Sequence, residues 1–142
     1  MDLPKVLFVC VENACRSQMA EAFLRMAGAG EVHALSAGSR PAGQVNPRAT
    51  VMMAEVGYDL TAHRSTGLDE IPPGPYQAVV TMGCGDACPN VAAAIREDWN
   101  IPDPKEMPTE QFRQVRDQIG RRVRVLLERV RALAEEEAEQ VG

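Results

Sequence analysis

The sequence predicts an α/β fold in which helices cover both faces of a parallel sheet. Short apolar runs of strand length, such as Val6 to Val9 and Ala78 to Met82, alternate with segments whose apolar residues recur at helical spacing. Strands joined by helical crossovers form parallel sheets covered on both faces. The chain has 142 residues, so we expect a single three-layer domain over residues 1–142.

The first strand and the helix after it frame a short loop. Val6 to Val9 is continuously apolar, which suits a strand buried on both faces. Ser17 is expected to cap the helix that follows, and Gly28 and Gly30 to end it. The apolar residues of this helix are Met19, Ala22, Phe23, Met26 and Ala27.

The middle of the chain repeats the pattern of strand and helix. Val32 to Leu35 is the second predicted strand, and the turn-prone stretch SAGSRPAG follows it. Asn46 and Pro47 suit the start of a helix that Gly57 would stop.

The last third of the chain supplies two further strands and a long helix. Ala78 to Met82 is the third predicted strand, and Glu97 to Trp99 is a weaker fourth. Apolar residues at helical spacing predict a helix from about Pro108 to Ala134. Its arginines are followed by acidic residues and have no aromatic residues between them, so we interpret them as a solvated face and not as a nucleic-acid surface.

Composition limits the class of protein. The net charge is −5 and the sequence pI is about 5.1, which favours binding neither to nucleic acid nor to an anionic membrane. There is no apolar run of membrane-spanning length, and the start MDLPKVLFVCV does not resemble a signal peptide. We therefore expect a cytoplasmic monomer, in which four cysteines are more often catalytic, redox-active or metal-bound than structural.

The stretch VCVENACRS places a cysteine, an arginine and a serine between the first strand and its helix. Loop N–H groups at a helix N-terminus form a cradle for an oxyanion. Arg16 can hold two oxygens of that anion, while Ser17 can donate a hydrogen bond that stabilises a Cys10 thiolate. Asn13 suits the left-handed backbone of a tight loop. The predicted oxyanion-binding residues are Val11, Glu12, Asn13, Ala14, Cys15 and Arg16. The alternative is a buried structural cysteine beside a surface arginine.

The segment CVENACRS resembles the C-x5-R-S/T phosphate loop of the low-molecular-weight protein tyrosine phosphatase superfamily. SQMAEAF, SAGS at 36–39 and Asp103-Pro104 extend the resemblance over nearly the whole chain. Two families share the fold: the phosphatases, and the arsenate reductases that use thioredoxin or, in some bacteria, mycothiol. Gln18, Lys105 and the segment VVTMGCGDACP resemble the reductases more. The resemblance implies a four-stranded parallel sheet in the order 2-1-3-4.

The resemblance also implies an arsenate reductase with a cysteine relay. Cys10 would attack arsenate held by Arg16, with Asp103 as general acid. Cys84 would then attack Cys10, releasing arsenite, and Cys88 would attack Cys84. The resulting Cys84–Cys88 disulfide would be reduced by thioredoxin, which is favoured here over mycothiol, and no cofactor is expected to be tightly bound. Phosphate or sulfate would bind as an analogue of arsenate.

The alternative function is a phosphatase acting on phosphotyrosine or small phosphoesters. It would need only Cys10, Arg16 and Asp103. Some residual phosphatase activity is expected in either case, because arsenate and phosphate share shape and charge.

Several other residues could bind a metal or have a role of their own in the site. Four cysteines could bind zinc, but their spacing is unusual and an arginine adjoins them, so no metal is expected. Cys15 is expected to be a small buried thiol, and His33 and His63 to be solvated or packed without special partners. Asp103 between two prolines could also be only a rigid turn.

Some related reductases bind potassium beside the phosphate loop. Asn13, Glu21 and Ser36 match three of the residues that bind it. The chain has Arg64, Ser65 and Thr66 where the fourth, an aspartate, would fall. Arg64 is therefore the candidate to supply positive charge there instead.

Overall fold

The computed structural model describes residues 3–83 and 91–141. Four parallel strands form one sheet in the order β2-β1-β3-β4, which confirms the predicted order. The two central strands are buried on both faces, as their continuous apolar runs require. The strands are β1 (Lys5–Cys10), β2 (His33–Gly38), β3 (Tyr76–Thr81) and β4 (Ala93–Asp98).

The outer strands differ in extent from the prediction. β4 was predicted at Glu97 to Trp99 but covers Ala93–Asp98. It lies at the edge of the sheet, where Ile95 is its one buried residue, so its sequence lacks a strong apolar run. β2 continues to Gly38 through residues expected to form a turn, because their small side chains fit against β1.

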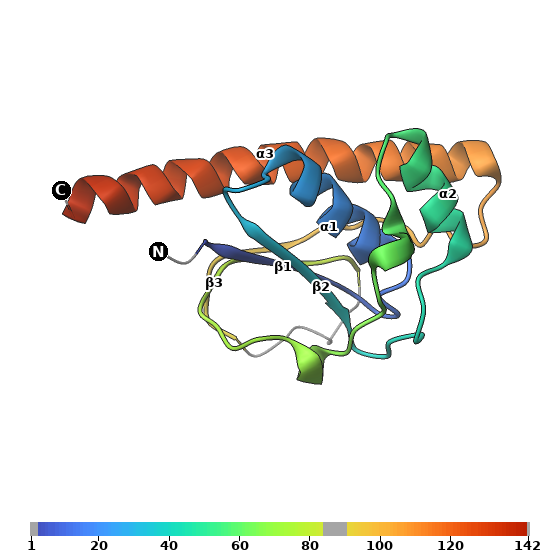
Figure 1. Ribbon diagram of the computed structural model, residues 1–142, viewed down its shortest axis with the longest axis horizontal. Helices are drawn as coiled ribbons and strands as arrows, with labels where there is room; N and C mark the ends of the chain where they lie inside the picture. The colour runs from blue at the N-terminus through green and yellow to red at the C-terminus, as the bar shows by residue number, and fades with distance from the viewer. Residues whose placement is uncertain (1–2, 84–90, 142) are drawn as a thin grey trace.

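The helices are α1 (Arg16–Ala27), α2 (Pro47–Glu55) and α3 (Thr109–Val141), with short 3-10 helices η1 (Leu60–Ala62) and η2 (Leu68–Glu70). Asn46 caps α2 as predicted, since its side chain accepts a hydrogen bond from the backbone of Arg48. Figure 1 shows α1, α2 and α3 together on one side of the sheet. They share one large core with that face of the sheet.

The second face of the sheet carries a smaller core. Leu7, Val9 and Val79 pack there against Leu68 of η2 and Ile71. The layer on this face is therefore thinner than the helical layer that the sequence predicted. Among the described residues, η2 and extended chain cover it.

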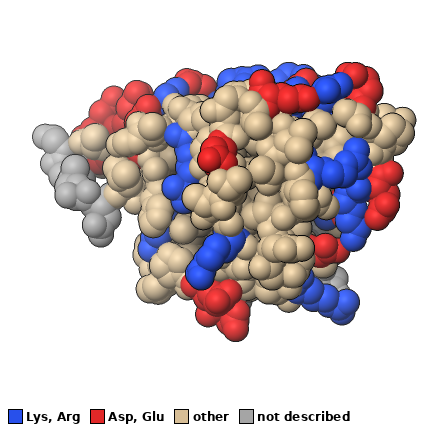
Figure 2. Space-filling model, turned by 45° about the vertical axis from the view of Figure 1, so that its right-hand side comes forward, with Lys and Arg blue, Asp and Glu red and all other residues tan. Residues whose placement is uncertain are grey.

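Three of the seven arginines of α3 that were predicted to be solvated, Arg113, Arg129 and Arg131, take part in surface ion pairs. Arg113 pairs with Glu55 of α2 at 2.8 Å, and Arg131 with Glu31 at 2.8 Å. Figure 2 shows basic and acidic side chains interspersed on one face of the molecule. Arg116 is an exception, because it is buried and donates to Glu55 Oε1 at 2.6 Å. Within the described ranges, no helix has the length and apolar character needed to cross a bilayer.

Candidate active site

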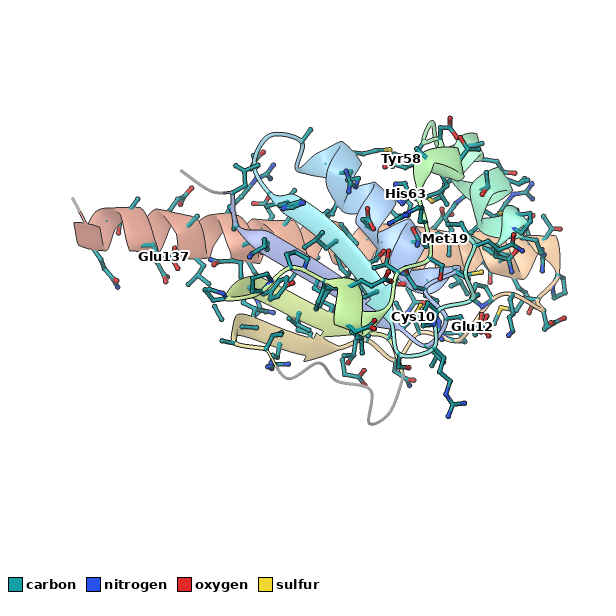
Figure 3. The ribbon with its side chains drawn as sticks, turned by 60° about the horizontal axis from the view of Figure 1, so that its bottom comes forward. Cys10, Glu12, Met19, Tyr58, His63 and Glu137 are labelled. Carbon is teal, nitrogen blue, oxygen red and sulfur yellow. The ribbon has the colours of Figure 1, made fainter. Side chains whose placement is uncertain are left out.

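The loop between β1 and α1 lies at the carboxyl end of the sheet, where parallel α/β folds place their ligand sites. Cys10 is the last residue of β1 and Arg16 the first of α1. The end of β3 lies beside them, because Met82 N–H donates to Val9 O at 2.9 Å. Figure 3 shows Cys10 and Glu12 close together at this end of the sheet, far from Glu137 of α3.

Hydrogen bonds from the chain after β2 fix the loop. Three loop carbonyls accept them: Val11 from Arg40 at 2.8 Å, Glu12 from Ala42 at 2.9 Å and Ala14 from Asn46 at 3.0 Å. These contacts use the acceptors of the loop. Its N–H donors are therefore what the loop can offer to an anion.

Asn13 holds the centre of the loop in the left-handed conformation, with a φ of 51°. It is fully buried, and its Oδ1 accepts hydrogen bonds from Thr66 N at 2.7 Å and from Gln18 Nε2 at 3.0 Å. Its Nδ2 donates to Ser17 Oγ at 2.8 Å. The side chain of Asn13 thus ties the loop to α1 and to the segment before η2.

Ser17 contacts the sulfur of Cys10, with 2.9 Å between Oγ and Sγ, and both side chains are buried. Since the Asn13 amide can only donate to Ser17 Oγ, the hydroxyl hydrogen of Ser17 is free to point at the sulfur. A hydroxyl donor of this kind stabilises a thiolate. The prediction that Ser17 caps α1 is wrong: the N-cap is Cys15, and the Ser17 hydroxyl is committed to Cys10 and Asn13.

The guanidinium of Arg16 is anchored beside the sulfur. Its Nη1 donates to Met82 O at 2.6 Å and to Ile101 O at 3.0 Å, which are carbonyls just beyond β3 and β4. These bonds engage one of its nitrogens, and the others can serve as the fork that binds an oxyanion.

A small cavity brings most of the predicted site residues together. It is lined by Cys10, Glu12, Ala14, Cys15, Arg16, Asn46, Asp103 and Lys105. Asp103 is exposed at its rim, and its Oδ1 accepts a hydrogen bond from Lys105 N at 3.1 Å. A sulfur, a guanidinium and a carboxyl group that can exchange protons with solvent therefore face one space.

Cys15 is the second thiol of the cavity. Burial raises the pKa of Cys15 to about 12, and the negative charges of Asp103 and Glu12 act in the same direction. A pKa this high favours the protonated thiol near neutral pH, so Cys15 is not expected to act as the nucleophile. Both Cys10 and Cys15 are free thiols.

Cys84 and Cys88 lie outside the described residues, and so does Asp86. The described chain after β3 ends at Gly83, which has a φ of 71°. A Cβ at Gly83 would lie 3.7 Å from Arg16 Nη1. Gly83, the last described residue before this segment, therefore lies close to the guanidinium of Arg16.

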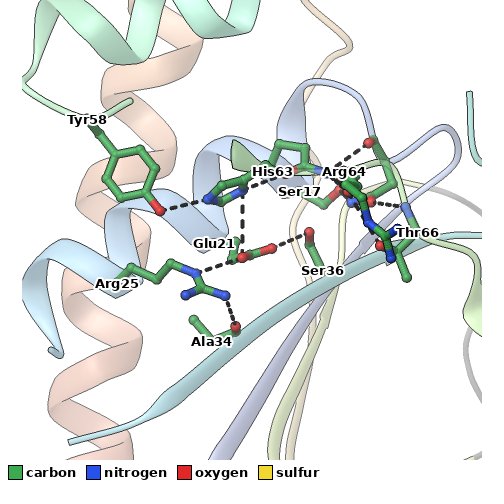
Figure 4. A network of polar contacts seen from close by, with 11 residues as sticks. Ser17, Glu21, Arg25, Ala34, Ser36, Tyr58, His63, Arg64 and Thr66 are labelled. Atoms are coloured by element: carbon green, nitrogen blue, oxygen red, sulfur yellow. Dashed lines mark hydrogen bonds and ion pairs between the residues drawn. The ribbon is translucent and has the colours of Figure 1, made fainter. Parts of the chain in front are cut away.

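Behind the loop, a chain of polar contacts runs from Tyr58 through His63 and Gln18 to Asn13. Figure 4 shows the part of it between Tyr58 and His63. Tyr58 Oη lies 2.7 Å from His63 Nε2, and His63 Nδ1 lies 2.9 Å from Gln18 Oε1. Gln18 Oε1 can only accept, so Nδ1 of His63 donates and Nε2 accepts from Tyr58. Burial lowers the pKa of His63, while Glu21 opposes that shift, and the neutral ring fits these contacts.

Sequence reasoning expected His63 to be solvated or packed, and it is partly buried, but its hydrogen-bonded partners were not predicted. Tyr58 lies five positions away, whereas Gln18 lies 45 positions away on α1. A signal was available in Gln18 and His63, two polar residues that could support Asn13 in the left-handed turn.

At the candidate potassium position, the carboxylate of Glu21 is already engaged by other side chains of the protein. Glu21 is buried and accepts hydrogen bonds from Ser36 Oγ at 2.6 Å and from Arg25 Nε at 2.7 Å. The positive charge beside Glu21 is therefore that of Arg25, one helical turn away on α1, and not that of Arg64. Among residues 3–83 and 91–141, no group of three or more His, Cys, Asp or Glu side chains is placed to hold a metal ion.

Gly38 allows the loop to pack closely against β2. A Cβ at this position would lie 2.5 Å from Val11 O and 2.9 Å from Asn13 N. Gly38→Ala is therefore expected to lower the free energy of unfolding by about 1–3 kcal/mol and to weaken phosphate binding. Chemical denaturation and calorimetric titration with phosphate measure the two effects.

Gly43→Ala is the comparison without a clash, since a Cβ there meets nothing within 4 Å. Gly43, unlike Gly38, has a positive φ of 89°, so its alanine is expected to cost stability through backbone strain while phosphate binding is kept. If Gly38→Ala binds phosphate as tightly as the unmodified chain, Gly38 does not shape the loop.

Comparisons with known proteins agree with this geometry. The family model of the low molecular weight phosphotyrosine protein phosphatases matches residues 5–138. The glutaredoxin arsenate reductase of Synechocystis is 39% identical over 131 residues, which cover 90% of this chain and 99% of that protein.

Two solved structures extend the comparison. An arsenate reductase in the phosphate-binding state has a TM-score of 0.83 and 39% identity, over 90% of this chain and 99% of that one. A thioredoxin-dependent arsenate reductase of Corynebacterium glutamicum has a TM-score of 0.76 and 30% identity, over 92% of this chain and 63% of that one. The chain therefore belongs to the low-molecular-weight phosphotyrosine protein phosphatase family and, within it, to the arsenate reductases.

Proposed function

We propose that this chain reduces arsenate to arsenite, starting with attack by Cys10. The observation that carries the proposal is the Cys10 sulfur 2.9 Å from Ser17 Oγ, in a cavity that Arg16 and Asp103 also line. A sulfur nucleophile beside a fixed guanidinium suits a tetrahedral oxyanion. The relatives named as arsenate reductases support the same substrate for this chain.

In the first step, the Cys10 thiolate attacks arsenic and forms a sulfur–arsenic bond. Arg16 and the loop N–H groups hold the other oxygens. Asp103 donates a proton to the departing oxygen, which leaves as water. Arsenic remains in its oxidised state until the next thiol reacts.

In the second step, the Cys84 thiolate attacks the Cys10 sulfur. The sulfur–arsenic bond breaks, its electron pair stays on arsenic, and arsenite leaves. A Cys10–Cys84 disulfide remains, so two thiols have supplied the two electrons. The position of Met82, which contacts both β1 and Arg16, supports this step because Cys84 follows it by two residues.

In the third step, Cys88 attacks Cys84 and frees Cys10 for another cycle. The Cys84–Cys88 disulfide then accepts electrons from an external reductant, for which we propose cytoplasmic thioredoxin. The names of the relatives differ on this point: one is a glutaredoxin arsenate reductase and another is thioredoxin-dependent.

The test is release of arsenite with two reducing systems in parallel, each followed by NADPH oxidation. One contains thioredoxin and thioredoxin reductase, and the other contains glutaredoxin, glutathione and glutathione reductase. We expect arsenate-dependent oxidation of NADPH with thioredoxin, and one arsenite for each NADPH. Faster turnover with glutaredoxin would correct the reductant but keep the reaction.

The phosphatase is the second candidate, because the described site contains all that phosphoester hydrolysis needs. Slow hydrolysis of p-nitrophenyl phosphate is expected as a side reaction. Hydrolysis of phosphoesters without arsenite release in either reducing system would make the phosphatase the principal activity.

A further inference from the structure

An ion pair lies at the mouth of the candidate active site. Lys105 Nζ and Glu12 Oε1 are 2.7 Å apart, and both residues line the cavity that contains Cys10 and Arg16. Figure 3 shows Glu12 on the loop beside Cys10. The pair joins residues 93 positions apart in the chain.

The backbone of Lys105 is fixed on both sides. Its N–H donates to Asp103 Oδ1 at 3.1 Å, and its carbonyl accepts from Arg48 Nη1 at 2.9 Å. Arg48 in turn stacks on the ring of Phe112, with 4.8 Å between the guanidinium carbon and the ring centre. Lys105 is therefore held at the cavity by its neighbours, and its ammonium group is directed at Glu12.

The contribution of this pair to folding is small. The side chains of Lys105 and Glu12 are 39% and 41% exposed, and pairs this exposed add little to stability. The carboxylate of Glu12 raises the pKa of Lys105, so the lysine is fully charged at neutral pH. The main effect of the pair is therefore on the charge of the cavity.

A carboxylate in an anion-binding loop opposes the binding of an anion. Glu12, Asp103 and a Cys10 thiolate give the cavity three negative groups, against which Arg16 and Lys105 are its positive ones. Without the Lys105 charge, the unpaired carboxylate of Glu12 would repel the incoming oxyanion.

We propose that Lys105 is a positioning residue for oxyanion binding, which acts by neutralising Glu12. Its ammonium group holds the Glu12 carboxylate in an ion pair at the rim, and the loop and Arg16 then bind the anion. The identity of the anion as arsenate rests on the proposed function. The role of the ion pair does not, because inorganic phosphate can test it.

The test is a double-mutant cycle measured by calorimetric titration with inorganic phosphate. Lys105→Met is expected to weaken phosphate binding about 10-fold, the effect of an uncompensated charge a few ångströms from the anion. Glu12→Gln/Lys105→Met, which removes both charges of the pair, is expected to bind phosphate within about twofold of the unmodified chain. Lys105→Arg keeps the charge and is expected to stay within about threefold of the unmodified chain.

Lys5→Met is the matched control, because it removes the same charge at the other end of β1. It should leave phosphate affinity unchanged. Thermal unfolding of every variant separates lost binding from lost folding. The KM for arsenate should follow the same pattern, with kcat changed less.

Two results would overturn the proposal. Wild-type affinity in Lys105→Met would show that the lysine charge is irrelevant. Equal weakness in Lys105→Met and the double variant would show that Lys105 binds the anion directly and does not act through Glu12. The predicted phosphate pattern in a chain that reduces no arsenate would keep this proposal and reject the proposed function.

Discussion

Cys10→Ser is expected to abolish arsenate reduction and p-nitrophenyl phosphate hydrolysis together, each by about 10⁴-fold or more. Both reactions begin with a bond to the Cys10 sulfur, and a serine hydroxyl in the same place remains protonated and attacks poorly. The hydrogen bond from Ser17 suits a thiolate, which the variant cannot form. Arsenite release and nitrophenol release measure the two rates, and calorimetry shows whether phosphate still binds.

Cys15→Ala is the matched comparison for this prediction. It removes the other described thiol of the cavity and keeps the loop backbone. Because burial raises the pKa of Cys15 to about 12, its sulfur is not expected to react, and activity should stay within about 10-fold. Loss of activity in Cys15→Ala with activity kept in Cys10→Ser would reverse the assignment of the nucleophile.

Cys84→Ser is expected to separate the two reactions. Arsenite release should fall by about 10³-fold or more, because no second thiol can break the sulfur–arsenic bond. Hydrolysis of p-nitrophenyl phosphate should stay within about threefold, since water completes that reaction without a second thiol. The two rates are measured on one preparation, so misfolding would lower both.

Cys88→Ser provides the control for the order of the relay. It should release arsenite once per chain and then stop, because the Cys10–Cys84 disulfide can form but cannot be transferred. Continuous turnover with thioredoxin in either cysteine variant would contradict the relay.

Local sequence signals predicted the parts of the fold and the site that depend on neighbouring residues. The apolar runs of β1 and β3 and the Asn46-Pro47 start of α2 carry such signals. So does the loop from Cys10 to Arg16, where the order of strand, loop and helix brings the groups together. Edge strand β4 gave a weak signal, because one of its faces is polar.

The contacts that sequence reasoning missed join residues distant in the chain. His63 meets Gln18 across 45 positions, and Lys105 meets Glu12 across 93. The pair of Arg25 with Glu21 on α1 was not predicted, because helical spacing alone does not show which nearby cation a buried carboxylate contacts. A single sequence gives no measure of such pairing, since surface ion pairs form wherever the fold places opposite charges together.

The approach of the Cys84 sulfur to Cys10 is the central claim, and peptide mapping of Cys88→Ser after reaction with arsenate tests it most directly. The protein is alkylated, digested without reductant and analysed by mass spectrometry. A Cys10–Cys84 disulfide in proportion to the arsenite released is the predicted result. Arsenite released while Cys84 remains a free thiol, or a disulfide between Cys10 and Cys15 in its place, would contradict the account.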